Sequence, residues 1–344
     1  MNNRRYTTGN AEFDAQIESL AQATGDPANS DLIREILVTA LKLSGDKANR
    51  GDLKIINAAL KELRYAFKLF ARYRGIRKVS IFGSARIQKD DPEYRQTVEF
   101  ARAIAQEGWM VITGGGSGIM EAGHEGAGRD RSFGVNIRLP WEQAANPVIE
   151  RDRKLVTFKY FFARKLTFLK ESDAVVLCPG GFGTLDEGYE TLTLIQTGKG
   201  RPMPLVFLDK PGGTYWQSWK RYIEDHLLQR GLIAPDDMSL FKVTDDPVEA
   251  CRELTRFYSN YHSMRFVRDL LVLRLQRRPS PQLLAHLNQE FAEIITKFEL
   301  SVNGPVEGEM DEPELAHLPR LTFYFDRNHW GRLRQMIDVI NNEA

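Results

Sequence analysis

Apolar residues at intervals of three and four positions predict helices in the first part of the chain. The segments 11–24, 30–44 and 51–73 all follow this spacing. In the third segment one side of the helix carries an apolar stripe, made of Ile56, Leu60, Leu63, Phe67 and Phe70. We therefore expect residues 1–75 to form a helical N-terminal segment. Its stripe would pack on the next domain or on a partner subunit, and a regulatory binding site is the alternative.

From Lys78 onward the pattern changes to short, nearly continuous apolar runs, at 78–85, 109–116, 133–140, 174–181, 204–209 and 240–246. Most of them alternate with helical stretches, at 93–108, 119–129, 159–172, 184–198, 215–231 and 247–261. Buried strands that alternate with helices are typical of a parallel sheet covered on both faces. The pattern predicts an α/β domain over residues 76–262, built on a Rossmann-like doubly wound parallel sheet.

The remaining residues, 263–344, break this rhythm. A strand is expected within 266–277, although the apolar run there is too short to exclude a helix. A helix that begins near Ser280 and Pro281 and a second strand at 297–303 follow. An acidic loop at 304–319 precedes a third strand at 320–326 and a final helix at 329–342. This β-α-β-loop-β-α order predicts a small ferredoxin-like α+β module at the C-terminus.

Composition narrows the possible partners. In the 344 residues, 47 Lys and Arg balance 46 Asp and Glu, so no global charge attracts a nucleic acid polymer or a membrane surface. No stretch approaches the roughly 18 apolar residues of a membrane span. Cys178 and Cys251 lie in apolar surroundings without a CxxC partner, which predicts buried thiols and no structural zinc. We expect a cytoplasmic protein without a metal or a cofactor.

Three of the expected strands end in turns rich in small residues. The first turn is Phe82-Gly83-Ser84-Ala85-Arg86, the second runs from Thr113 through Gly114, Gly115, Gly116, Ser117 and Gly118 to Met120, and the third is Pro179-Gly180-Gly181-Phe182-Gly183-Thr184. Glycine lets the backbone approach a ligand, and the helix that follows offers free N–H groups. Three such turns in one domain predict a phosphate or nucleotide site at the carboxyl ends of the strands.

The better-known nucleotide motifs do not fit. A dinucleotide fingerprint requires G-x-G-x-x-G after the first strand, but the first turn here is Gly83-Ser84-Ala85. The chain also has no G-x-x-x-x-G-K-[ST] motif. These departures disfavour a redox dinucleotide or ATP as the ligand.

Three charged residues need an explanation. Arg164 and Lys165 lie in the middle of an apolar, aromatic helix. Their aliphatic stems can cover the core while the charged groups reach water. Alternatively, the guanidinium group of Arg164 can bind a phosphate or a carboxylate. Glu187 follows the third glycine turn, and Thr184-Leu185-Asp186-Glu187 has the pattern of a capping box. Glu187 therefore either caps a helix or orients a water, and the local pattern does not separate these roles.

Three segments, GGGSGIMEA (114–122), ARKLTFLKESDA (163–174) and PGGFGTLDE (179–187), resemble the motifs of the LOG ("Lonely guy") family, formerly described as lysine decarboxylases. The resemblance implies a phosphoribohydrolase that splits nucleoside 5′-monophosphates into free base and ribose 5-phosphate, with cytokinin-type or general purine and pyrimidine nucleotides as substrates. It also implies a homo-oligomer, and the extra terminal regions are similar to those of longer bacterial members.

Carried over residue by residue, the resemblance makes Arg164 and Glu187 catalytic. It places the substrate and its phosphate against Gly83, Ser84, Gly114, Gly115, Gly116, Gly118, Met120, Lys165, Gly180, Gly181, Gly183 and Thr184. Glu187 would stabilise an oxocarbenium-like state and position water, while Arg164 would hold the phosphate or ribose. The alternative is a non-catalytic nucleotide-binding or sensing protein, which would bind the nucleotide and leave it intact.

Overall fold

The computed structural model describes residues 6–139, 144–309 and 312–343. The chain divides into two compact units between Tyr65 and Ala66. Within the described ranges, no helix has the length and apolar character needed to cross a membrane.

The first unit is helical, as expected. It contains α1 (Ala11–Gln22), α2 (Ser30–Gly45) and the start of α3 (Arg50–Phe70). The side chain of Asn10 caps α1 by accepting hydrogen bonds from the backbone N–H groups of Glu12 and Phe13. Ile17 of α1 and Val38 of α2 are buried, and the two helices contact each other. This confirms the three helices predicted in the N-terminal segment.

The second unit is built on a parallel sheet of seven strands in the order β4-β3-β2-β1-β5-β6-β7. The strands are β1 (Lys78–Phe82), β2 (Met110–Thr113), β3 (Ser132–Ile137), β4 (Leu155–Phe158), β5 (Ala174–Leu177), β6 (Leu205–Leu208) and β7 (Lys242–Thr244). This confirms the predicted α/β, Rossmann-like fold. The strand order reverses between β1 and β5, and a doubly wound sheet binds its ligands at the carboxyl ends of the strands beside such a reversal.

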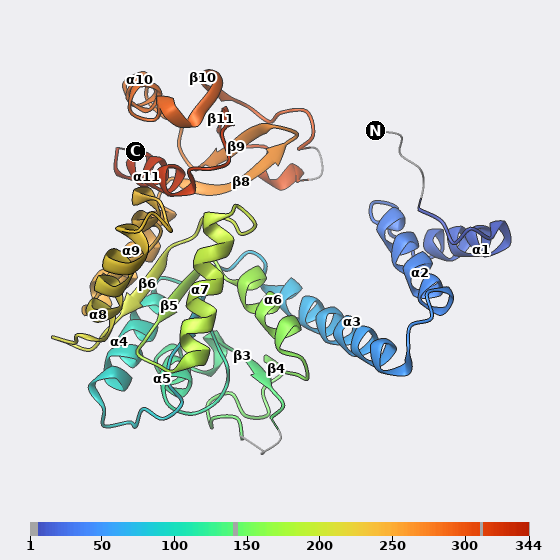
Figure 1. The fold of residues 1–344 in the computed structure, drawn as a ribbon, viewed down its shortest axis with the longest axis horizontal. Coiled ribbons are helices and arrows are strands. Elements are labelled where there is room, and N and C mark those ends of the chain that lie inside the picture. Colours follow the sequence, from blue (N-terminus) through green and yellow to red (C-terminus); the bar gives the residue numbers. More distant parts are fainter. Residues whose placement is uncertain (1–5, 140–143, 310–311, 344) are drawn as a thin grey trace. The chain divides into compact units, whose positions relative to one another are not determined.

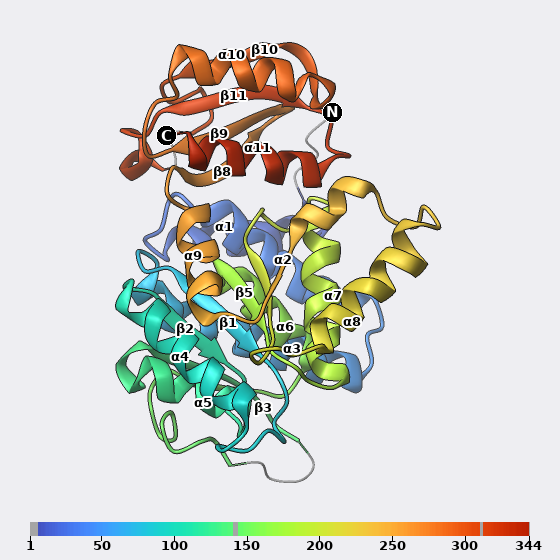
Figure 2. The same ribbon diagram turned by 90° about the vertical axis from the view of Figure 1, so that its left-hand side faces the viewer.

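Helices cover both faces of this sheet. In Figure 2, α4 (Pro92–Gln106), α5 (Ile119–Ala127) and α9 (Pro247–Phe257) lie on the face toward the viewer. The opposite face carries α6 (Phe161–Glu171) and α7 (Phe182–Gln196), which lie in front in Figure 1. Near β6, Trp219 of α8 (Tyr215–Ile223) stacks on Phe207 with ring centroids 4.3 Å apart. The strands between these layers are buried because helices exclude water from both sides.

One strand of the sheet was not predicted, and one expected run is shorter. β4 consists of four residues, Leu155–Phe158, in which Thr157 is exposed, so it lacks a continuous apolar run. The expected run 133–140 forms a strand only as far as Ile137, and its last residue, Pro140, lies outside the described residues.

The C-terminal part is α+β, as expected, but its order of elements differs. Four antiparallel strands lie in the order β10-β11-β9-β8 and two helices accompany them: β8 (Tyr261–Val267), β9 (Leu270–Leu275), α10 (Pro281–Glu290), β10 (Ile295–Asn303), β11 (Arg320–Phe325) and α11 (Trp330–Asn342). The segment 266–277, expected to hold one strand, contains the end of β8, a turn and β9, and β8 and β9 together form a hairpin. Its turn contains Arg268 at φ +57°, without the glycine or asparagine that marks such turns in a sequence.

The resulting order, β-β-α-β-β-α, corrects the ferredoxin-like order predicted from the sequence. β8 also begins at Tyr261, ahead of the expected boundary between residues 262 and 263. The division of the chain into domains at 1–75, 76–262 and 263–344 stays a prediction.

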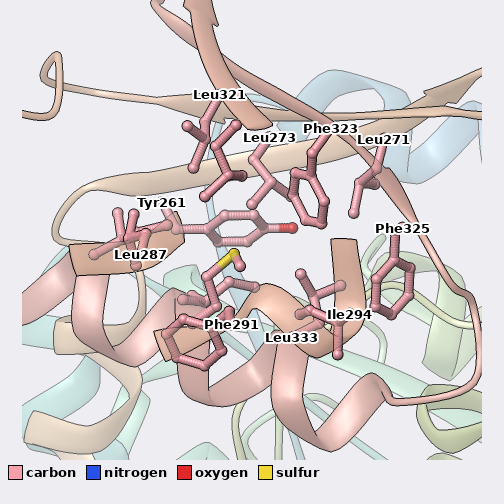
Figure 3. Close-up of a cluster of buried hydrophobic side chains, with 14 of the residues drawn as sticks. Tyr261, Leu271, Leu273, Leu287, Phe291, Ile294, Leu321, Phe323, Phe325 and Leu333 are labelled. Atoms are coloured by element: carbon pink, nitrogen blue, oxygen red, sulfur yellow. The ribbon is translucent and has the colours of Figure 1, made fainter. Parts of the chain in front are cut away.

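This C-terminal module has its own apolar core. Figure 3 shows Leu271, Leu273, Leu321 and Phe323 of the sheet pointing toward side chains of the helical layer, among them Leu333. All of these side chains are almost completely buried. Burial of this cluster stabilises the module in the same way as an independent domain core.

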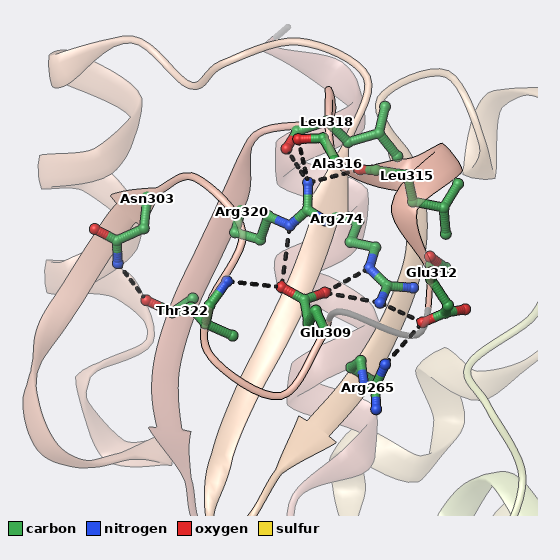
Figure 4. Close-up of polar contacts among 12 residues, drawn as sticks. Arg265, Arg274, Asn303, Glu309, Glu312, Leu315, Ala316, Leu318, Arg320 and Thr322 are labelled. Carbon is green, nitrogen blue, oxygen red and sulfur yellow. Dashed lines mark hydrogen bonds and ion pairs between the residues drawn. The ribbon is translucent and has the colours of Figure 1, made fainter. Parts of the chain in front are cut away.

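A buried ionic network supports one side of the module (Figure 4). The Glu309 carboxylate accepts hydrogen bonds from Arg274 Nε at 2.8 Å and from Arg320 Nε at 3.2 Å, and also from the backbone N–H of Val306 at 3.1 Å. Glu312 pairs with Arg274 and with Arg265. The network fixes part of the expected acidic loop against β9 and β11, whereas residues 310 and 311 of that loop lie outside the described residues.

Candidate active site

A cavity of about 810 Å³ lies at the reversal of strand order. Its wall is formed by the turns after β1, β2 and β5 and by the first turns of α6 and α7. It brings together ten of the residues predicted from the sequence: Gly83, Ser84, Gly114, Met120, Arg164, Gly180, Gly181, Gly183, Thr184 and Glu187. The volume suits a mononucleotide-sized ligand.

Backbone hydrogen bonds hold the three glycine turns together. Ser84 N donates to Pro179 O at 3.1 Å, which links the first turn to the third. Ile119 N donates to Ser84 O at 3.1 Å, which links the second turn to the first. Gly118 makes this second link possible because it adopts φ +64° and an added Cβ would lie 2.3 Å from Ser84 O. Segments that are distant in the sequence thus form one rigid ligand-facing surface.

The first turn of α7 faces the cavity without a cap. The helix begins at Phe182, its N-cap is Gly181, and no side chain within the described residues caps it. Thr184 therefore lies inside the first turn, and the capping box expected from the pattern Thr184 to Glu187 does not form. The open N–H groups and the positive end of the helix dipole favour a bound anion at this position.

Glu187 is a buried carboxylate with an unpaired oxygen. Its side chain lines the cavity, only 7% of the residue is exposed, and its Oε2 atom has no hydrogen-bond partner in the described structure. Burial raises the pKa of Glu187 to about 7, although the nearby charges of Lys165 and Arg164 oppose the shift. A carboxylate kept dry and unpaired in this way can receive a proton or a developing positive charge from a ligand.

Arg164 projects from α6 toward the same wall. Its Nε atom donates to Val135 O of β3 at 2.9 Å, which fixes the orientation of the guanidinium. An added Cβ on Gly114 would lie 2.6 Å from Arg164 Nη2, so the absence of a side chain at this turn leaves room for the guanidinium. Burial lowers the pKa of Arg164 and the charge of Glu187 opposes this change. The structure thus places a fixed cation beside the glycine turns, rather than the solvent-exposed head expected from snorkelling.

Lys165 forms ion pairs with two acidic residues of α7. Its Nζ atom forms an ion pair with Asp186 Oδ2 at 2.9 Å and with the carboxylate of Glu190. Although burial alone would lower it, these contacts raise the pKa of Lys165. The side chain does not line the cavity but faces a neighbouring groove of about 610 Å³ between α6 and α7. In this arrangement Lys165 ties α6 to α7 instead of pointing at the ligand.

Gly115, Gly116 and Gly118 also stay outside the cavity wall, and a buried polar network supports their turn. Asn146 Nδ2 donates to Gly116 O at 2.9 Å and to His124 Nδ1 at 3.1 Å. The other ring nitrogen of His124 lies 2.9 Å from Phe133 O, and burial lowers the pKa of this histidine, so the neutral ring is favoured. Sequence analysis missed this network because its members are far apart in the chain and form no motif.

The cavity wall also contains residues that were not predicted as site residues, among them Phe161, Phe182 and Arg86. Phe161 lies one helical turn before Arg164 and is 55% exposed, and Phe182 begins α7 and is 93% exposed. Arg86, at the end of the first turn, adds an exposed cation to the wall. The signal for Phe161 is its spacing of three residues from Arg164, which places both on one helix face. Within the described residues, no cluster of His, Cys, Asp or Glu is arranged to hold a metal.

Part of this chain is similar to a known protein family and to known proteins. A family model described as "Possible lysine decarboxylase" matches residues 116–254. The chain is 28% identical over 156 residues to a cytokinin riboside 5′-monophosphate phosphoribohydrolase of Mycobacterium tuberculosis. The aligned region covers 45% of this chain and 81% of that protein. The chain is 25% identical over 187 residues to the corresponding enzyme LOG3 of Arabidopsis thaliana, covering 53% and 83%. The X-ray structure of the protein TM1055 aligns over 52% of this chain and 97% of its own length, with 26% identity and a TM-score of 0.37.

Proposed function

Because this chain belongs to the LOG family, we propose that it hydrolyses the N-glycosidic bond of a nucleoside 5′-monophosphate. The observation that carries the proposal is Glu187, a buried carboxylate with an unpaired oxygen and a pKa of about 7 in a cavity with a fixed arginine. The products would be the free base and ribose 5-phosphate.

The 5′-phosphate would bind where the glycine turns meet the start of α7. Gly181 and Gly183 leave open space at this end, since an added Cβ on either would meet no atom within 4 Å. The uncapped N-terminus of α7 supplies backbone donors and a favourable dipole to a dianion. Arg164 and the exposed Arg86 provide positive charge on the same wall. Fixing the phosphate in this way orients the sugar relative to Glu187.

Glu187 would act on the anomeric carbon. In the ionised state its carboxylate stabilises the positive charge that develops as the bond to the base breaks. The bonding electron pair leaves with the base, the oxygen of a water molecule adds to the anomeric carbon, and a proton from that water balances the charge on the base. A carboxylate of pKa about 7 can also accept the proton of the attacking water.

The base would lie against the aromatic side of the cavity. Phe161 and Phe182 offer apolar faces without hydrogen-bond donors or acceptors, and each purine or pyrimidine has a π-face that can stack on such a ring. Stacking tolerates different bases. We therefore expect activity on several nucleoside monophosphates rather than on a single cytokinin nucleotide.

The purified full-length protein tests the proposal. It would be incubated with AMP, GMP, CMP, UMP, IMP and N6-isopentenyl-AMP, and free base and ribose 5-phosphate would be measured by chromatography. We expect release of both products from at least one nucleotide. In Glu187→Gln, kcat should fall by about 10²–10³-fold, the usual loss when a group that stabilises transition-state charge is removed.

Glu171→Gln is the matched control. Glu171 is a buried glutamate at the end of α6 that pairs with Lys170 and lies outside the cavity wall, so its variant should keep wild-type activity. A nucleotide that raises the melting temperature but is recovered intact would contradict hydrolysis and favour a sensing protein. Equal losses in both variants would show that folding, and not the chemistry of Glu187, limits the activity.

A homo-oligomer stays part of the proposal. Phe161, Phe162 and Leu166 on α6 are each about half exposed, and exposed apolar side chains on one helix favour burial in an interface. Light scattering of the purified protein measures its mass in solution, and a mass of one chain would contradict this expectation.

A further inference from the structure

A second cavity, of about 410 Å³, lies at the amino-terminal ends of the strands, whereas the glycine turns lie at the carboxyl ends. Three segments line it, and each precedes a strand: the end of α3 and the following turn before β1, Arg129 before β3, and residues 151–154 before β4. Since the strands are parallel, these segments meet at their amino-terminal ends. The cavity is therefore separate from the candidate active site, which lies at the carboxyl ends.

Positive charge dominates this second cavity, which we call the amino-edge cleft because it lies at the amino-terminal ends of the strands. Five of its eight lining residues are cations and one is an acid: Arg72, Arg129, Arg151, Arg153 and Lys154 against Asp152. Glu150 adds one more carboxylate, 3.7 Å from Arg151 Nε. The local excess is still three positive charges, in a chain whose total net charge is +1. A concave surface with one sign of charge focuses the field and attracts small ions of opposite sign.

Asp152 organises the inner part of the cleft. Its Oδ1 atom accepts hydrogen bonds from Lys154 Nζ at 2.9 Å and Lys154 N at 2.8 Å, and its Oδ2 atom accepts from Arg129 Nε at 2.9 Å. Arg129 Nη2 also donates to Glu150 O at 3.0 Å. Although burial alone would raise it, these contacts lower the pKa of Asp152. One carboxylate thus positions two cations and neutralises only one of them.

The outer cations have few partners. Arg72 and Arg153 are exposed and make no ion pair or side-chain hydrogen bond within the described part of the chain. The side chain of Arg151 is 90% exposed, and its backbone adopts φ +59°. These three arginines repel one another and the inner pair, and a bound polyanion would relieve this repulsion. Arginine is well suited to such a ligand because its planar fork donates two hydrogen bonds to one phosphate.

We propose that the amino-edge cleft binds a small phosphate-rich anion. Asp152 holds Arg129 and Lys154 in place as the inner contacts, and Arg72, Arg151 and Arg153 close on the ligand from the rim. The site is independent of the nucleotide cavity, so the inference does not rest on the proposed hydrolysis.

Inorganic tripolyphosphate is the probe. Its binding to the full-length protein would be measured by isothermal titration calorimetry and by the shift in melting temperature, against sodium chloride of equal ionic strength. We expect saturable binding to the wild type. Affinity should weaken about tenfold in Arg72→Ala and again in Arg153→Ala, the typical loss for one charge-assisted hydrogen bond.

Two variants make the result specific. Arg102→Ala removes an exposed arginine on α4 outside the cleft and should bind as the wild type does. Arg164→Ala impairs anion binding at the nucleotide cavity and should also keep the tripolyphosphate affinity. A response equal to that of sodium chloride would overturn the proposal. So would binding that is lost in Arg164→Ala and unchanged in Arg72→Ala and Arg153→Ala.

Discussion

Two buried glutamates, one in each sheet region of the second unit, show opposite uses of the same side chain. Glu309 in the C-terminal module is 4% exposed and Glu187 in the α/β region is 7% exposed, so both are largely removed from water. Glu309 is fully surrounded by donors, namely Arg274, Arg320 and the backbone of Val306. Glu187 keeps an oxygen without any partner.

Their pKa values shift in opposite directions. Burial raises the pKa of Glu187 to about 7 because the nearby cations only partly offset it. Burial alone would also raise the pKa of Glu309, but the hydrogen bonds from Val306, Arg274 and Arg320 lower it instead. Burial alone therefore does not set the protonation behaviour of a carboxylate, because its hydrogen-bond partners decide the direction of the pKa shift. What distinguishes the candidate active site is a buried charge whose partners are left for a ligand to supply.

The largest effect on stability is expected at Glu309. Glu309→Ala leaves Arg320 and Arg274 buried without their shared acceptor, which should cost about 3–5 kcal/mol of unfolding free energy. Urea unfolding followed by circular dichroism measures the loss. A change below about 1 kcal/mol would show that the network of Figure 4 does not support the module and would remove the contrast with Glu187.

A smaller effect of opposite sign is expected at Glu187. Its raised pKa means that the ionised carboxylate destabilises the folded state, so Glu187→Gln should gain about 1–3 kcal/mol of unfolding free energy at pH 8. The wild type is fully stabilised at this site below pH 4.5 and loses that stability as the pH rises toward 7. The gain should therefore disappear near pH 4.5.

Glu309→Gln should show the opposite pH dependence of unfolding free energy. Since the pKa of Glu309 is lowered on folding, the wild type should hold its full advantage over this variant above pH 4.5 and lose it as the pH falls further. If the difference in unfolding free energy from the wild type changed with pH in the same way for Glu187→Gln and Glu309→Gln, the two carboxylates would not lie in opposite environments.

The pH dependence of catalysis should report Glu187 directly. If the ionised carboxylate is the active form, kcat/KM falls about tenfold per pH unit below pH 7. Initial rates with the best nucleotide between pH 5 and pH 9 measure the profile. The residual activity of Glu187→Gln should lack this slope, and a wild-type profile that stays flat through pH 7 would exclude Glu187 as the titrating group.

The smallest effect is expected at Glu312, the outer member of the network. Its side chain is 36% exposed, and Arg274 would keep its contact with Glu309 after Glu312→Gln. The loss should be about 0–1 kcal/mol of unfolding free energy, as for other solvent-screened pairs. A loss as large as that of Glu309→Ala would mean that the greater exposure of Glu312 does not lower its contribution to stability relative to Glu309.

The sequence predicted most of the α/β region because its local signals agree. Apolar runs and glycine turns located six of the seven strands, and β4 was missed because four residues with an exposed threonine carry little periodicity. The ferredoxin-like order failed at a single turn, where Arg268 adopts a conformation that glycine or asparagine usually signals. Ten predicted site residues line the cavity, whereas Lys165 faces a neighbouring groove because its acidic partners lie on another helix.

The class of fold follows from local periodicity, and the residues predicted to contact a phosphate follow from glycine at strand ends. The hydrogen bonding of each buried carboxylate and the direction of its pKa shift depend on tertiary contacts. The capping pattern at Thr184 allowed Glu187 to be a helix cap, and the fold excluded this by starting α7 at Phe182. Hydrogen bonding and desolvation depend on neighbours brought together from distant segments, and these neighbours leave Glu187 unpaired and give Glu309 its partners.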